Sequence, residues 1–213
     1  MTATRVARRA RARRGEGERL REEIVAATER LLIDTGSVDA VSIRAVADAV
    51  GVTPPSIYIH FAHKEDLIFE VCARNFRALD AVIEQATCDE CDPLDEVKAI
   101  GRAYIAFGLD HPEQYRLLFM TRTITLDPEQ MRERIMDVSG FTRVVSATQR
   151  CIDEGAFVPG DAFTIACGLW IGVHGITSLF ISKPTFPWPD RDQLVDHVLD
   201  VYCRGLAPAE ETT

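Results

Sequence analysis

The stretch from Ser42 to Leu67 constrains the fold of this 213-residue chain more than any other segment. It reads SIRAVADAVGVTPPSIYIHFAHKEDL. Its first part has apolar residues at the i, i+3, i+4, i+7 spacing of one helix face, namely Ile43, Val46, Ala47 and Val50. Ser42 precedes these residues as a candidate N-cap, and Gly51 follows them where a left-handed cap favours glycine. The pattern therefore predicts a short amphipathic helix with defined ends.

A second short helix is predicted to start at Thr53-Pro54, because a hydroxyl can cap it and proline loses no hydrogen bond at the first helical position. It should end near His60, with Ile57 and Phe61 directed inward. Two short helices joined by a turn of three to four residues that contains glycine form a helix-turn-helix.

The exposed face of this second helix carries side chains that suit phosphates and base edges in a major groove. Either of its two prolines can also touch a thymine methyl group. The predicted DNA-binding residues here and on the flanking helices are Ser42, Arg44, Thr53, Pro54, Pro55, Ser56, Tyr58, His60 and Lys64.

The spaced motif V-G-V-T-x-x-x-I-Y-x-H-F-x-x-K-x-x-L, from Val50 to Leu67, resembles the DNA-binding signature of the TetR/AcrR family of bacterial transcriptional regulators. The resemblance implies that the Tyr58 hydroxyl reaches a phosphate, whereas its ring could instead close a small core. For Phe61, a core position is expected. The consecutive prolines 54 and 55 depart from the family pattern, which weakens the expectation of base-specific hydrogen bonds there.

The formal net charge of −9 is distributed unevenly along the chain. Residues 1–70 contain equal numbers of basic and acidic residues, so the whole excess of acid lies in residues 71–213. Residues 1–16 are predicted to form a basic disordered arm, whose Arg13 and Arg14 could enter a minor groove next to the operator. A solvated tail that adds non-specific affinity is the alternative, and both make binding salt-dependent.

The predicted fold is all-α, with about nine helices and no strand pattern. The further helices are expected at about residues 18–35, 64–86, 94–110, 112–120, 128–154, 161–182 and 191–206. The resemblance implies a three-helix DNA-binding head over residues 17–63, a six-helix effector-binding and dimerisation body over 64–206, and a tail at 207–213. The helix at 64–86 would be roughly 30 Å long and would link head to body.

Two glycines four residues apart, Gly168 and Gly172, lie on one face of the predicted helix 161–182. Interior helical glycines cost up to about 1 kcal/mol each, so close packing against a neighbour is expected there. The resemblance implies that the last two helices of two subunits pair about a twofold axis, and such a dimer would present two heads to a near-palindromic operator. The predicted interface residues are Gly168, Gly172, Leu179, Leu194, Val198 and Val201.

The segment Trp170-Ile-Gly-Val-His174-Gly175 resembles the Trp–His–Gly motif of the WHG subgroup of TetR-like C-terminal domains. The resemblance implies that Trp170 and His174, which share a helix face, border an effector cavity between helices. For any single residue, an ordinary core position is the alternative. Few charges lie among the candidate positions, which predicts a hydrophobic effector such as an acyl chain or a lipophilic aromatic. The candidate walls are Phe76, Tyr104, Phe107, Phe119, Met120 and Phe141.

The predicted function is thus a homodimeric, ligand-responsive transcriptional regulator in the bacterial cytoplasm, most simply a repressor released by its effector. No catalytic, metal-ligand or nucleotide motif appears, so neither enzymatic activity nor a cofactor nor a metal is expected. The lone Cys88-Asp-Glu-Cys91 motif leaves a redox sensor as an alternative. The apolar run at 162–182 is expected to be a buried helix and not a membrane span, since it lacks membrane flanks.

Overall fold

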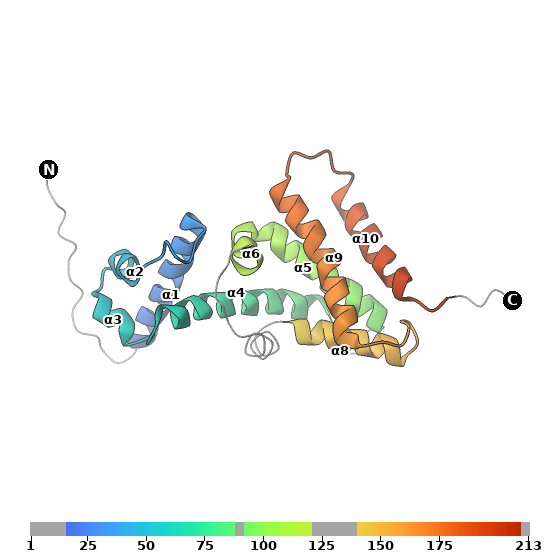
Figure 1. Cartoon of the computed structure of the whole chain (residues 1–213), viewed down its shortest axis with the longest axis horizontal. Coiled ribbons are helices and arrows are strands. Elements are labelled where there is room, and N and C mark those ends of the chain that lie inside the picture. The colour runs from blue at the N-terminus through green and yellow to red at the C-terminus, as the bar shows by residue number, and fades with distance from the viewer. Residues whose placement is uncertain (1–15, 88–91, 121–139, 210–213) are drawn as a thin grey trace. The chain divides into compact units, whose positions relative to one another are not determined.

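The computed structural model describes residues 16–87, 92–120 and 140–209. These ranges contain nine helices and no strand, which confirms the all-α prediction (Figure 1). Of the predicted helix 128–154, residues 128–139 lie outside the described ranges, as do the N-terminal arm and both cysteines of the CxxC motif. The helices are α1 (Glu16–Thr35), α2 (Ile43–Val50), α3 (Pro54–Tyr58), α4 (Lys64–Ala86), α5 (Pro93–Asp110), α6 (Pro112–Phe119), α8 (Phe141–Asp153), α9 (Ala162–Ser182) and α10 (Arg191–Leu206).

The chain divides into two compact units. Among the described residues, the first comprises residues 16–75 and 113–120, and the second comprises residues 76–87, 92–112 and 140–209. Helix α4 contributes residues to both units, and α6 belongs to the first from Glu113 onward. The first unit is therefore larger than the predicted head of residues 17–63.

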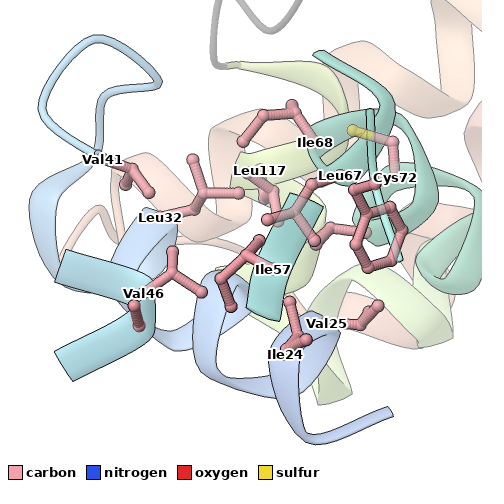
Figure 2. Packing of buried hydrophobic residues seen from close by; sticks show 13 residues of the cluster. Ile24, Val25, Leu32, Val41, Val46, Ile57, Leu67, Ile68, Cys72 and Leu117 are labelled. Carbon is pink, nitrogen blue, oxygen red and sulfur yellow. The ribbon is translucent and has the colours of Figure 1, made fainter. Parts of the chain in front are cut away.

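The core of the first unit explains this larger extent (Figure 2). Buried side chains of α1, α2 and α3 pack with Leu67, Ile68 and Val71 of α4 and with Leu117 of α6. Leu117 is only 2% exposed. Three short helices alone are too small to enclose a hydrophobic core, so side chains of α4 and α6 complete it.

Polar contacts join α1 to α4 within this unit. The Arg21 guanidinium donates to Glu70 at 2.6 Å and lies over the ring of Phe61, 5.0 Å from its centroid. The buried amide of Asn75 donates to Glu29 at 2.9 Å. Since Phe61 itself is buried, the Arg21 contact holds the chain just after α3 against α1, while the two hydrogen bonds join α1 to α4.

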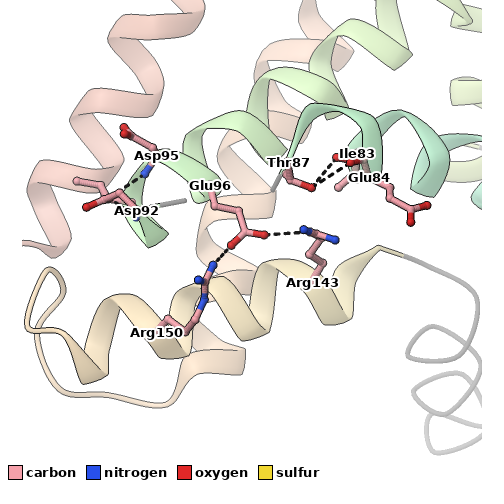
Figure 3. A network of polar contacts seen from close by, with 9 residues as sticks. Ile83, Glu84, Thr87, Asp92, Asp95, Glu96, Arg143 and Arg150 are labelled. Atoms are coloured by element: carbon pink, nitrogen blue, oxygen red, sulfur yellow. Dashed lines mark hydrogen bonds and ion pairs between the residues drawn. The ribbon is translucent and has the colours of Figure 1, made fainter. Parts of the chain in front are cut away.

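In the second unit, α5 packs on α8, α9 and α10. Glu96 of α5 is buried, and its carboxylate forms ion pairs with Arg143 and Arg150 of α8 (Figure 3). A buried carboxylate is tolerated only when it is paired in this way. Two partly exposed ion pairs join α5 to α10 on its other side, Lys98–Asp200 and Arg102–Asp196, each at 2.8 Å.

The first turn of α8 receives a carboxylate from α4 within the same unit. Gly140 is the N-cap residue of α8 and has no capping side chain of its own, but its amide donates to the carboxylate of Asp80. Burial raises the pKa of Asp80 to about 6, while this hydrogen bond opposes the increase. Asp80 thus caps α8 from another helix.

Each unit holds buried, free thiols. Cys72 lies in the core of the first unit, and Cys151 and Cys203 are buried in the second. Burial raises the pKa of Cys72 and of Cys151 to about 11, and it also raises the pKa of Cys203. These thiols therefore hold their protons at neutral pH.

Within the described residues, one helix is long and apolar enough to cross a membrane, and this helix is α9. The core helix of a globular protein passes the same test. Helix α9 packs on α5, α8 and α10, and it buries side chains along its whole length, from Ala162 to Ile181. This packing agrees with the prediction of a core helix.

Candidate functional site

The helix-turn-helix is built by local signals. The Ser42 hydroxyl accepts a hydrogen bond from the amide of Ala45 at 3.1 Å and so caps α2. Gly51 ends α2 with φ at 78°, in the left-handed region where a side chain would be strained. Its amide and that of Val52 donate back to Ala47, which closes the turn before α3.

The outward face of α3 is apolar. Ile57 is fully buried, so residues about half a helical turn away from it point outward. Pro55, Tyr58 and Ile59 stand at i, i+3 and i+4 and are all exposed, with Tyr58 at 53% and Ile59 at 81%. Tyr58 therefore does not close the core, and Phe61 does. Sequence reasoning did not single out Ile59, although its position two residues after the inward Ile57 marks it as outward.

The polar candidates of this head make several contacts within the chain. Thr53 does not cap α3 through its side chain; its Oγ1 lies 3.0 Å from the Oγ of Ser56. The Lys64 ammonium donates to the carbonyl of Val38 at 2.5 Å.

The remaining predicted DNA contacts differ in exposure. Arg44 is exposed on α2, and His60 is half-buried just after α3. Pro54 is half-buried, and the predicted contacts Arg13 and Arg14 lie outside the described residues.

A second candidate site is an aromatic cluster of α5, α8 and α9 in the second unit. The indole Nε1 of Trp170 donates to the Tyr104 hydroxyl at 3.2 Å, and that hydroxyl lies 3.2 Å from Nδ1 of His174. The Phe141 ring meets Trp170 edge-on at 6.3 Å between centroids, and Phe163 meets Phe141 at 5.6 Å. The structure thus brings four predicted residues together and adds Phe163, which lies seven residues before Trp170 on the same helix face.

The hydrogen bonds of this cluster have one consistent direction. Burial lowers the pKa of His174, so its imidazole is neutral at physiological pH. A neutral imidazole can accept at Nδ1, so the Tyr104 O–H can donate to it while the Tyr104 oxygen accepts from Trp170. The cluster is therefore uncharged, and Trp170 remains 37% exposed at its edge.

The remaining candidate wall residues lie on α4, on α5 and at the end of α6. Phe107 is buried and packs on the ring of His111, 5.2 Å away. Phe76 is half-buried in the part of α4 that belongs to the second unit. Phe119 and Met120 belong to the first unit, where Phe119 packs on Tyr115 at 5.0 Å.

The predicted interface positions on α9 and α10 differ in exposure. A Cβ on Gly168 would meet nothing within 4 Å, whereas one on Gly172 would lie 2.7 Å from the Tyr202 ring of the same chain. The close approach at Gly172 is thus between α9 and α10. Leu179 and Val201 are about half exposed, at 47% and 52%, and Leu194 and Val198 are half-buried. Ile171 and Tyr202, which sequence reasoning missed, are exposed beside them at 63% and 40%.

Two family models match this chain and together span more than half of it. The model described as "Bacterial regulatory proteins, tetR family" matches residues 24–71. The model described as "Tetracyclin repressor-like, C-terminal domain" matches residues 97–202. The first match contains the helix-turn-helix, and the second contains most of α5 and the whole aromatic cluster. The chain belongs to the TetR family of transcription regulators.

Known relatives are similar at low identity. The chain is 26% identical over 153 residues to the nucleoid occlusion factor SlmA of Vibrio campbellii, a match that covers 68% of this chain and 72% of the relative. It is 31% identical over 109 residues to the HTH-type transcriptional activator FasR of Mycolicibacterium smegmatis, covering 51% and 48%. A solved structure of a protein with unknown function from Rhodococcus sp. RHA1 superposes with a TM-score of 0.73 at 27% identity, covering 89% of this chain and 96% of that one.

Proposed function

We propose that this protein is a homodimeric, ligand-responsive repressor that leaves a near-palindromic operator when a small hydrophobic effector binds its second unit. The exposed face of α3 within a capped helix-turn-helix is the observation that carries the DNA-binding part of this proposal. Arg44 would contact phosphates from α2 and the Tyr58 hydroxyl from α3. Arg13 and Arg14 would reach a neighbouring minor groove.

The dimer would form through α9 and α10. Four large apolar side chains are exposed on these two helices and would be covered by a second copy, namely Ile171, Leu179, Val201 and Tyr202. Gly168 has open space beside it, which suits close approach of a partner helix. Two heads related by a twofold axis would then contact half-sites about one helical turn apart.

The effector would bind against the Tyr104–Trp170–His174 cluster. An aromatic surface with a neutral histidine and a partly exposed indole favours an apolar ligand with few charges. Helix α4 has residues in both units and is the natural element to carry the response. A coupling of about 1–3 kcal/mol between effector and operator would suffice for a switch, and it must be reciprocal.

The DNA-binding part is tested by fluorescence anisotropy with the upstream intergenic DNA of the protein's own gene, against a scrambled duplex at about 0.15 M salt. Selective binding with two protomers per site is expected. Arg44→Ala should weaken binding to both duplexes and lower the salt dependence, since a phosphate contact is independent of sequence. Equal affinity for both duplexes in the unmodified protein would contradict the proposal.

The effector site is tested with a single-tryptophan protein. The chain has two tryptophans, so Trp188→Phe leaves Trp170 as the reporter. A series of acyl chains and lipophilic aromatics should change Trp170 fluorescence and raise the melting temperature. Operator DNA should lower the affinity of the protein for this ligand, and the ligand should lower the affinity for operator DNA by the same factor. Ligands that act equally with and without operator would refute the coupling.

A second candidate role is supported by the names of the relatives. FasR is a transcriptional activator and SlmA a nucleoid occlusion factor, so the effector-free dimer could activate a gene or take part in nucleoid occlusion. Transcription of the upstream fragment in vitro separates repression from activation. Chromatin immunoprecipitation separates one regulated locus from many. In each of these roles the protein is a cytoplasmic DNA-binding regulator and not an enzyme.

A further inference from the structure

The recognition helix lacks the side chains that normally read guanine and adenine. Arginine or lysine reads guanine by paired hydrogen bonds, and asparagine or glutamine reads adenine. Residues 49–64 contain no Arg, Asn or Gln, and their single lysine, Lys64, donates to the carbonyl of Val38. The hydroxyls of Thr53 and Ser56 face one another at 3.0 Å. Hydrogen-bond readout by this helix is therefore weak.

What the helix does present outward is apolar. Pro55, Tyr58 and Ile59 form one face, and Ile59 is the most exposed large hydrophobic side chain described for this protein, at 81%. Residues 49–64 also contain no Asp or Glu, although residues 1–70 as a whole carry as much acid as base. This face is thus compatible with the strongly negative surface of DNA. Thymine is the base that displays an apolar group, its C5 methyl, in the major groove.

We infer that Ile59 is a specificity-determining residue, and that Ile59 with Pro55 selects operators by contact with thymine C5 methyl groups. This inference rests on the proposed DNA-binding function and names the chemical group that the site recognises. Burial of one methyl group changes affinity about fourfold, so one such contact in each of two half-sites changes it roughly 15-fold. The contribution is apolar and should not depend on salt, unlike the phosphate contacts.

The test is a binding-site selection with the full-length protein and random-sequence duplexes in two pools. One pool contains thymine, and the other contains deoxyuracil, which pairs identically but lacks the methyl group. The thymine pool should yield a thymine-containing palindrome. The same sequence made with deoxyuracil in its half-sites should bind roughly 15-fold more weakly, and deoxyuracil in the flanks should have no effect.

Substitutions of Ile59 test whether this residue causes the preference for thymine methyl groups. Ile59→Ala should fold normally, because the side chain is exposed, and should bind the thymine and deoxyuracil sites within about twofold of each other. Ile59→Val should keep most of the preference, since it keeps a branched apolar group. Val158→Ala, at an exposed position in the second unit, is the matched control and should leave the preference unchanged.

The outcomes separate the two proposals. If the pools yield the same sequence with equal affinity, the protein selects DNA but not thymine methyl groups, and the inference about Ile59 is overturned. The same holds if Ile59→Ala keeps the full preference for thymine. If neither pool enriches any sequence, the proposed DNA-binding function fails, and the inference about Ile59 falls with it.

Discussion

In the first unit, the face proposed to meet DNA is made by residues within five positions of one another, on α3 and at its C-cap. The aromatic cluster of the second unit, in contrast, joins three helices that are distant in sequence. The outward Pro55, Tyr58 and Ile59 need only one helical turn to be placed. Tyr104 and His174 meet although they are 70 residues apart. The first site is thus encoded locally, and the second depends on the packing of a whole unit.

The first prediction compares the effects of a buried and an exposed substitution on the stability of the helix-turn-helix. Ile57 and Ile59 lie two residues apart, one fully buried and one 81% exposed. Ile57→Ala should lower the free energy of unfolding by about 4 kcal/mol, because it leaves a cavity in a small core, and it should also reduce DNA binding. Ile59→Ala should change the free energy of unfolding by less than about 0.5 kcal/mol. Urea unfolding followed by circular dichroism measures both, and similar losses would contradict the assigned orientation of α3.

The second prediction tests how far the other unit depends on long-range packing. Glu96→Gln removes the buried charge that pairs with Arg143 and Arg150, and it should cost about 2–3 kcal/mol of unfolding free energy. The value lies below that of a fully buried pair because both arginines are about one third exposed. Asp196→Asn, in the exposed pair with Arg102, should cost less than about 0.5 kcal/mol. Equal losses of unfolding free energy for the two variants would show that burial does not determine the contribution of these ion pairs to stability.

The third prediction separates two glycines on the same helix. Gly172→Ala places a methyl group against the Tyr202 ring and should lower the free energy of unfolding by about 1 kcal/mol. Gly168→Ala meets open space, so the helix propensity of alanine should stabilise the folded subunit by up to about 1 kcal/mol. If Gly168 faces a second copy, the same variant should weaken dimerisation in sedimentation equilibrium. An unchanged dimer would remove Gly168 from the proposed interface.

The fourth prediction concerns Asp80, which connects α4 to α8. Its pKa in the folded protein, about 6, lies above its ordinary value, so the folded state binds the proton more tightly than the unfolded state. The resulting stabilisation is fully present below about pH 4 and is lost as the pH rises through 6. Asp80→Asn keeps an oxygen acceptor for the Gly140 amide but does not titrate.

The melting temperature of the wild-type protein should therefore fall relative to that of the Asp80→Asn variant between about pH 4 and pH 7. Thermal unfolding of both proteins in the same buffers measures this difference, and the other titrating groups cancel in the comparison. A difference that stays constant across this range would show that Asp80 has an ordinary pKa in the folded state.

The same local and long-range distinction explains what the sequence could reveal. Ser42, Gly51 and Pro54 mark the ends of α2 and α3, because capping depends on residues within one turn, and these helices were predicted closely. The role of Leu117 in the core of the first unit was not predictable, since nothing in residues 112–120 shows which helix they pack against. The contact of Gly172 with Tyr202 was equally hidden, as it joins two helices across a loop.

The buried thiols give each unit its own reporter of transient opening. A protonated, enclosed cysteine reacts with an alkylating reagent only when the structure around it opens. Cys72 would report on the first unit, and Cys151 and Cys203 on the second. Labelling rates under native conditions would therefore show whether the two units breathe independently or as one cooperative body, without any engineered probe.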